Sequence, residues 1–572
     1  MTVNQELAGL FHEMATLLEI TGANQFRINA HSKVAGILED LPQGIGDFEK
    51  PSSIAGIGKG SAAKIAEYLE TGRIEAHDAL LEEIPDGLLE VMAVPGLGPK
   101  TVRLFWQDGG ITDIASLKAA IDDGSLELLP RMGAKSVGNI ADSIAFMEKS
   151  GGRMRLGEVL PLAESIEEML GKNATRVAHA GSLRRGRDTV GDIDLLAVGD
   201  AQKLAESFCT MPGVTKVLAR GDTKCSVRLE RGMQVDLRIV EEEAFGAAML
   251  YFTGSKDHNV QLRERAQTRS LRLNEYGLYP DDGGDGPPQD RGVVAIAART
   301  EEELYANLDL PWQPPEVREG RAEMEQTSTL ELIEVGDIKS DLHCHTTASD
   351  GQMSIEELAA EAMRRGYHTV AVTDHSKSSA QAGGLDEDRL ARHIDAIREV
   401  DAATPGIRLL AGSEVDILAD GRLDYEDDVL ATLDIVVASP HVALRQSPDK
   451  ATKRLLRAIE HPLVHIIGHP TGRLINARPG LEPDMPTLVA AAAERGTALE
   501  VNSNSWRLDL RDTHVRAAVD GGAWIAIDTD AHAPIDFDQL RYGIMTARRG
   551  WLNSTGCINC MSAEDLTAWL AR

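Results

Sequence analysis

The stretch from residue 180 to residue 198 reads AGSLRRGRDTVGDIDLLAV and places two acidic residues at the start of an apolar run. Alternate residues of a β-strand point to opposite faces, so Asp192 and Asp194 are expected to share one face. A second strand, predicted over residues 234–240, carries Asp236 in the same alternating pattern. Three carboxylates on one face repel one another unless cations lie between them. We therefore predict a site for two Mg²⁺ or Mn²⁺ ions that supports in-line phosphoryl transfer.

The residues that precede this acidic pair favour phosphate binding. Gly181 and Ser182 are predicted to open a short helix, whose free backbone N–H groups can donate to phosphate oxygens. Arg184 and Arg185 follow and balance the negative charge of a phosphate. A DxD pair alone is more often an exposed strand edge, but this combination favours an active site.

Two glycine-rich segments near the start of the chain predict contacts with a DNA backbone. Residues 54–63 read IAGIGKGSAA and residues 94–101 read VPGLGPKT, each between two predicted helices. Glycine lets the chain turn sharply and approach a phosphate, and the helix that follows offers its positive N-terminal end. The alternative is a helix–turn–helix corner with a glycine cap, which two lysine-bearing copies make less favourable. The predicted DNA-binding residues are Gly56, Gly58, Lys59, Gly60, Gly96, Gly98, Lys100 and Thr101.

Short apolar runs alternate with amphipathic helical segments over residues 336–572. This alternation is typical of a parallel sheet, and seven such units in one compact region predict a β/α barrel. The predicted strands are residues 341–345, 369–373, 409–411, 435–438, 464–467, 498–501 and 524–527.

Residues of metal-binding type stand at or just after the ends of these strands, where barrel enzymes build their active sites. Imidazole and carboxylate groups suit Zn²⁺, Mn²⁺ or Fe²⁺, and such a cluster can generate hydroxide near neutral pH and hold a phosphate. Nine ligands are too many for one ion and fit two or three. The predicted ligands are His343, His345, Asp350, His375, Glu414, His441, His469, Asp530 and His532.

The bulk composition limits the protein class. The chain has 572 residues, 42% hydrophobic and 26% charged, which predicts several globular domains with sizeable cores. Its formal charge of −31 lacks the excess of basic residues that is typical of DNA-binding proteins. Contacts with DNA are therefore expected from local lysines and backbone N–H groups. Five scattered cysteines and the lack of a long apolar run predict a soluble, cytoplasmic (nucleoid-associated) protein.

The order of these motifs resembles the family X DNA polymerases, with a core similar to that of DNA polymerase beta. GS-x-RRG is followed by GD-x-D at the family's spacing, then by YFTGSKDHN at residues 251–259 and LNEYG at residues 273–277. The resemblance covers about residues 1–315 and implies that Asp192, Asp194 and Asp236 are catalytic. It also implies a nucleotide site formed by Arg153, Gly181, Ser182, Arg185, Gly191, Tyr251, Phe252, Gly254, Asn259 and Arg263.

The same resemblance implies more specific roles. Tyr251 and Phe252 would pack against the sugar and exclude a ribose 2′-OH. Lys64 aligns with a lysine that forms a Schiff base with a 5′-deoxyribose phosphate in lyase chemistry. The sequence departs from the vertebrate pattern at Gln234, which replaces an arginine beside the third aspartate, and at Lys256, which replaces an aspartate near the base.

Residues 336–572 resemble the PHP (polymerase and histidinol phosphatase) domain, with all nine ligands present. That family implies that His343, His345, Glu414 and Asp530 hold one ion. Glu414, His441 and His469 would hold a second, and Asp350, His375 and His532 a third. The resemblance implies that this domain trims 3′ ends as a Mn²⁺-dependent 3′–5′ exonuclease, and that it cuts at abasic sites or removes 3′ phosphates.

Together these observations predict a multidomain chain with α-helical N-terminal helix-hairpin-helix domains, an α+β nucleotidyltransferase palm and thumb, and a C-terminal α/β PHP domain folded as a distorted (β/α)7 barrel. The predicted domains are residues 1–85, 86–150 (fingers-like), 151–240 (palm), 241–315 (thumb), 316–335 (linker) and 336–572. The expected function is gap filling in DNA repair by a monomer that binds gapped or primer-template DNA and dNTPs. Two alternatives stay open: small-molecule phosphatase activity in the barrel, and a non-catalytic scaffold that binds DNA ends.

Overall fold

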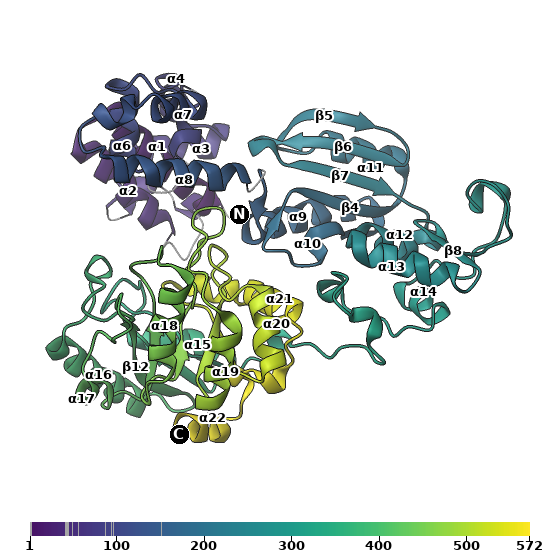
Figure 1. Cartoon of the computed structure of the whole chain (residues 1–572). Helices are drawn as coiled ribbons and strands as arrows, with labels where there is room; N and C mark the ends of the chain where they lie inside the picture. Colours follow the sequence, from purple (N-terminus) through teal and green to yellow (C-terminus); the bar gives the residue numbers. More distant parts are fainter. Residues whose placement is uncertain are drawn as a thin grey trace. The chain divides into compact units, whose positions relative to one another are not determined.

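The structure of the protein is a computed structural model that describes residues 3–571 except residues 40–44, 49, 55, 86, 93, 95–96 and 150–151. The chain divides into two compact units, Met1–Gly151 and Gly152–Arg572 (Figure 1). In the described part of the chain, every helix is too short or too polar to cross a lipid bilayer.

The first unit contains helices and no strands within its described residues. They surround one apolar core, in which Leu7, Phe11 and Phe105 are fully buried. The shared core explains why the predicted helical segments form one unit. The helices are α1 (Val3–Thr21), α2 (Gln25–Glu39), α3 (Lys59–Thr71), α4 (Glu75–Glu82), α5 (Leu88–Met92), α6 (Pro99–Gln107), α7 (Ile114–Asp122) and α8 (Ala134–Lys149).

A five-stranded sheet forms the palm region of the second unit, with strand order β2-β4-β7-β6-β5. β4 and β7 run parallel, and the other neighbouring strands run antiparallel. The strands are β2 (Ala174–His179), β4 (Asp192–Gly199), β5 (Val214–Arg220), β6 (Lys224–Leu229) and β7 (Gln234–Ile239), beside the short pair β1 (Met154–Arg155) and β3 (Thr189–Val190). The helices are α9 (Leu156–Gly171), α10 (Gly181–Arg184) and α11 (Ala201–Cys209).

Alternating side chains give this sheet two different faces. In β4, Ile193 and Leu195 are fully buried in the core that α9 and α11 share with the sheet. Asp192 and Asp194 alternate with these residues and therefore belong to the opposite face. Further along that face, Leu196 packs against Phe245 and Met249 of the thumb region. The apolar contacts thus fix the direction in which the two carboxylates point.

The thumb region follows the sheet and is built from helices and one hairpin. Its elements are α12 (Phe245–Thr253), α13 (Lys256–Gln267), β8 (Leu271–Asn274), β9 (Gly277–Pro280) and α14 (Glu301–Asn307). A buried carboxylate, Glu301, lies 2.6 Å from Arg318 Nη1 and 2.7 Å from Arg184 Nη1. Arg318 is fully buried, so the stretch after residue 315 begins as a segment packed into the thumb.

The rest of the second unit forms a seven-stranded parallel sheet that curves into a nearly closed barrel, which confirms the predicted fold. A parallel bridge between Cys344 and Ala531 joins the two ends of the sheet. The strands lie in sequence order: β10 (Ser340–Asp341), β11 (Thr369–Val372), β12 (Arg408–Asp416), β13 (Ile435–Ser439), β14 (Ile466–Ile467), β15 (Ala498–Asn502) and β16 (Ile525–Asp528).

Helices surround the barrel, and the strands are buried by apolar contacts on both of their faces (Figure 1). In β11, Val370 and Val372 belong to the large core that includes the surrounding helices. Ala371 belongs to a second cluster, which Leu566 and Trp569 join from the last helix. The helices are α15 (Ile355–Arg364), α16 (Glu387–Ala403), α17 (Asp427–Leu430), α18 (Pro448–Ile459), α19 (Met485–Arg495), α20 (Asp512–Gly521), α21 (Leu540–Arg549) and α22 (Ala563–Leu570).

We predict that Glu301→Gln destabilises the thumb by about 3–5 kcal/mol, because it leaves the buried Arg318 without a counter-charge. Burial raises the pKa of Glu301, but Arg318 and Arg184 outweigh it and lower that pKa, so the carboxylate is charged. The measurement is urea unfolding followed by tryptophan fluorescence, to which Trp312, whose Nε1 donates to Glu301 Oε2 at 3.3 Å, contributes as one of six tryptophans. The exposed neighbour variant Glu302→Gln should stay within about 0.5 kcal/mol of the native chain. Equal unfolding midpoints for both variants would contradict this role of Glu301.

Candidate active sites

The palm sheet brings the three predicted carboxylates together. In the parallel pairing of β4 with β7, Asp194 lies directly beside Asp236, and Asp192 lies beside Gln234. Neighbouring strands are about 4.8 Å apart, so the three carboxylates converge on the face opposite α9 and α11. This is the arrangement that the spacing of the sequence predicts.

The electrostatics of this acidic face suit a cation. Burial is the largest effect on Asp194, and repulsion by Asp192 and Asp236 adds to it, so the pKa of Asp194 rises to about 6. Burial also raises the pKa of Asp236, but hydrogen bonds from neighbouring side chains outweigh it and lower that pKa. Lys224 Nζ lies 3.0 Å from Asp236 Oδ2, and Gln234 Nε2 donates to Asp236 Oδ1 at 3.1 Å. A divalent cation among the carboxylates would relieve their repulsion, so the donor set fits Mg²⁺ or Mn²⁺.

The predicted phosphate-binding turn lies against these acids. Gly181 has a φ of +62°, and a Cβ added there would be 2.5 Å from Asp194 Oδ2. Ser182 follows in the first turn of α10, which has no side-chain cap. Arg153 packs against Gly191, since a Cβ added to that glycine would be 3.0 Å from Arg153 Nη1. The turn and the acids therefore form one site.

Both arginines of the turn already have protein partners. Arg185 Nε lies 3.0 Å from Glu319 Oε1, and its Nη1 donates to the carbonyl oxygen of Thr253. Arg184 is engaged by Glu301, as described above. A nucleotide phosphate at Arg185 would therefore compete with Glu319.

The thumb residues predicted to bind the nucleotide lie close together. Tyr251, Asn259 and Arg263 line one small cavity, and Asn259 Nδ2 donates to the carbonyl oxygen of Tyr251 at 2.7 Å. The ring of Phe252 meets that of Tyr251 edge-on, with centroids 5.1 Å apart. Gly254 ends α12 with a φ of +65°. These thumb residues thus lie near one another, and their role in nucleotide binding stays a prediction.

The glycine segments of the first unit each lead into a helix N-terminus. Gly58 precedes α3 and Gly98 precedes α6, and neither residue caps its helix with a side chain. The N–H groups of both first turns can therefore meet an anion. The other predicted contacts lie in or beside these turns at Gly56, Lys59, Gly60, Lys100 and Thr101, whereas Gly96 lies outside the described residues.

Two lysines of the first unit differ in their surroundings. Lys100 Nζ lies 3.7 Å from Glu19 Oε1, so part of its charge is balanced within the unit. Lys64, the predicted lyase residue, lies half-buried in α3. Burial is the main cause of the lowered pKa of His31, and the positive charge of Lys64 also contributes. The predicted lyase lysine therefore lies within electrostatic range of an imidazole.

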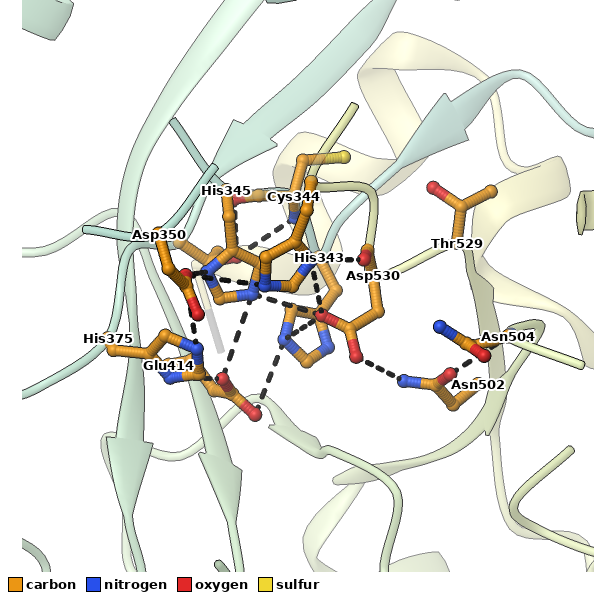
Figure 2. A network of polar contacts seen from close by, with 12 residues as sticks. His343, Cys344, His345, Asp350, His375, Glu414, Asn502, Asn504, Thr529 and Asp530 are labelled. Carbon is orange, nitrogen blue, oxygen red and sulfur yellow. Dashed lines mark hydrogen bonds and ion pairs between the residues drawn. The ribbon is translucent and has the colours of Figure 1, made fainter. Parts of the chain in front are cut away.

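The nine predicted barrel ligands gather where the strands end. Figure 2 shows the side chains of His343, His345, His375, Glu414 and Asp530 turned toward one another. Glu414 is central, because five imidazoles approach its two oxygens, among them that of His345, whose Nε2 lies 3.7 Å from Glu414 Oε2. The distances from Glu414 are 2.8 Å to His375 Nδ1, 2.8 Å to His469 Nε2, 3.2 Å to His441 Nε2 and 3.4 Å to His343 Nε2.

Two further carboxylates complete the cluster. Asp530 Oδ1 lies 3.1 Å from His345 Nε2, and Asn502 Nδ2 donates to Asp530 Oδ2 at 3.0 Å (Figure 2). Asp350 Oδ1 lies 3.3 Å from His532 Nε2. Burial raises the pKa of Asp530, but the neighbouring imidazoles outweigh it and hold that pKa well below its usual range. The carboxylates are therefore charged and ready to bind cations.

Ligand atoms that lie within 4.8 Å of one another form three groups. These groups resemble the division implied by the family, but His345 and His375 each belong to two of them. His469 contacts Glu414 and stands outside all three. The assignment of residues to separate ions stays a prediction. The groups are His343, His345 and Asp530; His375, Glu414 and His441; and His345, Asp350, His375 and His532.

Several ligand atoms are buried without a hydrogen-bond partner among the described residues. They are His343 Nε2, both ring nitrogens of His345, His375 Nδ1, Glu414 Oε2 and His469 Nδ1. Buried polar atoms in native proteins nearly always have a partner. Unsatisfied imidazole and carboxylate atoms in such a cluster fit Zn²⁺, Mn²⁺ or Fe²⁺.

Two buried carboxylates behind the histidines are missing from the predicted site. Glu500 Oε1 lies 2.6 Å from His343 Nδ1, and Asp416 Oδ1 lies 2.9 Å from His441 Nδ1. Such partners fix the ring orientation and leave Nε2 for a metal. The signal that could have found them is a carboxylate in an otherwise apolar strand end, as in ALEVN around Glu500.

Family comparisons agree with this architecture. Residues 2–74 match a helix-hairpin-helix domain, residues 88–145 a SAM-like helix-hairpin-helix tandem, residues 248–319 a DNA polymerase beta thumb and residues 341–504 a PHP domain. The chain is therefore a family X DNA polymerase with helix-hairpin-helix domains, a polymerase beta-type thumb and a C-terminal PHP domain.

Individual relatives support this membership. The chain is 38% identical over 574 residues to the "DNA polymerase/3'-5' exonuclease PolX" of Bacillus subtilis (strain 168), covering 99% of both chains. Shorter relatives match part of the chain. The "Probable phosphatase" of Syntrophotalea carbinolica is 34% identical over 29% of this chain and 66% of its own length. A "Probable phosphatase" of Thermoanaerobacter sp. (strain X514) is 29% identical over 38% of this chain and 89% of its own length.

We predict that Gly181→Ala lowers nucleotide incorporation about a hundredfold, because the added Cβ displaces the Asp194 carboxylate. The matched control is Gly283→Ala, where φ is +69° and nothing lies within 4 Å of the added Cβ. Both variants place an alanine at a positive φ, but only Gly181→Ala brings the added Cβ into contact with Asp194. Single-nucleotide primer extension measures the effect, and equal rates for the two variants would exclude a role for the close contact.

We predict that Glu500→Gln weakens metal binding or 3′-end trimming by the barrel about 10–100-fold, because His343 loses its orienting carboxylate. Burial lowers the pKa of His343, but Glu500, Asp530 and Glu414 together raise it. The measurement is trimming rate against Mn²⁺ concentration, with primer extension by the same preparation as a folding control. The exposed variant Glu494→Gln should behave as the native chain, and the prediction fails if Glu500→Gln does so too.

Proposed function

We propose that this family X DNA polymerase fills short gaps in DNA during repair, and that its PHP domain trims 3′ ends or processes abasic sites. DNA polymerase and 3′–5′ exonuclease activities are supported by the 38% identity to PolX over 99% of both chains. The observation that carries the polymerase assignment is the register that sets Asp194 directly beside Asp236.

In the palm, we assign the acids to metal binding and the neighbouring turn to the nucleotide. Asp192, Asp194 and Asp236 would hold two Mg²⁺ or Mn²⁺ ions, which supply the charge stabilisation that phosphoryl transfer needs. Gly181 and Ser182 would donate backbone N–H groups to the triphosphate. The thumb residues around Tyr251 would pack against the incoming nucleotide. Arg153, Arg185 and Gly191 of the palm would also contact that nucleotide.

In the barrel, we assign the nine ligands to two or three Zn²⁺, Mn²⁺ or Fe²⁺ ions, which supply hydroxide near neutral pH and hold a phosphate. Glu414 bridges the histidine groups, and Glu500 and Asp416 position two of the rings. The cluster is buried except at Asp350, His441 and His532, whose side chains are 34%, 20% and 31% exposed, so a phosphate would reach it from that side.

In the first unit, we assign the two glycine hairpins to gripping the DNA backbone without reading its sequence. Lys64 is the candidate for lyase chemistry on a 5′-deoxyribose phosphate. The substrates would be gapped or primer-template DNA and dNTPs, and we propose that the chain acts as a monomer with the domain boundaries given above.

A second candidate function for the barrel is hydrolysis of a small phosphate ester. It is favoured by the two relatives named "Probable phosphatase". Rates of phosphate release from a sugar phosphate and of trimming of a primer strand, measured with the same protein, separate the two functions. The faster substrate identifies the function of the barrel.

We predict that the two activities separate by mutation. Asp192→Asn should reduce primer extension by about three orders of magnitude, equivalent to roughly 4 kcal/mol of barrier, and leave trimming intact. His343→Ala should do the reverse. The measurement is a gapped duplex with dNTPs and Mg²⁺ or Mn²⁺, resolved for both longer and shorter products. Extension that survives Asp192→Asn, or trimming that survives His343→Ala, would overturn the corresponding assignment.

A further inference from the structure

The barrel packs against the palm through α21 and through the loop after β14, which contains Arg473. Arg473 Nη1 lies 3.0 Å from Asp188 Oδ2, and Arg549 Nη1 donates to the carbonyl oxygen of Arg185 at 2.6 Å. Arg549 is almost fully buried by these contacts. The palm and the barrel thus meet along a packed seam just after the phosphate-binding turn.

A cavity of about 230 Å³ opens within this seam. Its lining contains five arginines from the palm, the segment after the thumb and the barrel: Arg187, Arg321, Arg473, Arg511 and Arg549. We call this cavity the seam pocket. None of the nine barrel ligands and none of the three palm acids lines it.

The acidic groups of the seam pocket do not balance its arginines. Asp188 and Asp512 are the acidic side chains in the lining, and Glu319 outside it lies 2.9 Å from Arg549 and 3.8 Å from Arg187, so five arginines meet three carboxylates. Asp512 is shared by Arg549 at 2.7 Å and Arg321 at 3.3 Å. The pocket is therefore locally positive, whereas the whole chain has a formal charge of −31.

Arg511 is the least satisfied of these arginines. Its side chain forms no ion pair with any residue in the described ranges, and its Nε is buried without a hydrogen-bond partner. Arg511 also precedes α20 and leaves that helix without a side-chain cap, while Thr513 of the first turn lines the pocket. A guanidinium that lacks a partner, beside the positive end of a helix, is arranged to receive an anion.

Neighbouring titratable groups respond to the same positive field. Burial is the main reason that the pKa of His514 falls to about 4, and Arg511 and Arg473 lower it further. Burial raises the pKa of Asp512, but Arg549 and Arg321 outweigh it and bring that pKa to about 2. The pocket therefore favours negative charge.

We propose that the seam pocket binds a phosphate group, supplied either by a DNA strand or by free pyrophosphate. The pocket is wide enough for a phosphate group and far too small for a duplex. Bound there, a strand phosphate would be held between the palm and the barrel, outside both catalytic clusters. The proposal needs neither activity to be correct, because it concerns binding alone.

Two variants test the pocket from opposite sides in the full-length, metal-loaded protein. Arg511→Gln removes the unpaired guanidinium on the barrel side, and Arg187→Gln removes a partly exposed one on the palm side. Arg495→Gln, on the exposed surface of α19, is the matched control. The probes are a labelled single strand with 3′ phosphorothioate linkages, followed by anisotropy, and sodium pyrophosphate, followed by calorimetry.

Removal of a charge-assisted hydrogen bond should weaken binding of the affected probe about tenfold in a pocket variant. For the single strand, the slope of log K against log salt should also fall by about 0.7 for each phosphate that the variant no longer neutralises. A change for the strand identifies DNA as the ligand, and a change confined to pyrophosphate identifies the free anion. If both pocket variants bind both probes as Arg495→Gln does, the proposal is overturned.

Discussion

The palm site depends on the parallel pairing of β4 with β7, which sets Asp194 against Asp236. The pairing is stable because the opposite face of the sheet is filled by Ile193 and Leu195, which pack against the covering helices. The apolar face thus holds together carboxylates that repel one another. Burial is the main cause of the raised pKa of Asp194, and repulsion by Asp192 and Asp236 adds to it. A divalent cation bound among these carboxylates would remove the repulsion that packing imposes.

The barrel cluster is organised by a different constraint. Its carboxylates and imidazoles attract one another. The imidazole rings can therefore face a metal only if residues outside the cluster fix their orientation. Glu500 and Asp416 do this by accepting hydrogen bonds from His343 and His441 behind the cluster. These buried carboxylates explain how histidines on separate strands keep one orientation.

Much of this arrangement follows from the sequence, and the exceptions have physical reasons. Alternating apolar and helical segments are enough to predict the seven barrel strands, and the nine predicted ligands, which lie at or after six of those strands, gather in one cluster. The edge strand β5 has mostly exposed side chains, so its pattern gives no alternation to detect. Arg318 resembles a solvent-exposed linker residue until its burial against Glu301 is known. The partners of Arg185 could not be predicted, because Glu319 and Thr253 reach it only through tertiary packing.

The contact of Arg549 with the carbonyl oxygen of Arg185 and with Glu319 has an evolutionary consequence. Helix α21 of the barrel here contacts the predicted phosphate-binding turn of the palm. Glu319 is paired with both Arg185 and Arg549. A lineage that lost the C-terminal barrel would therefore expose Glu319 and leave it with Arg185 but without Arg549. The fusion is therefore difficult to reverse, because losing one module requires compensating change in the other.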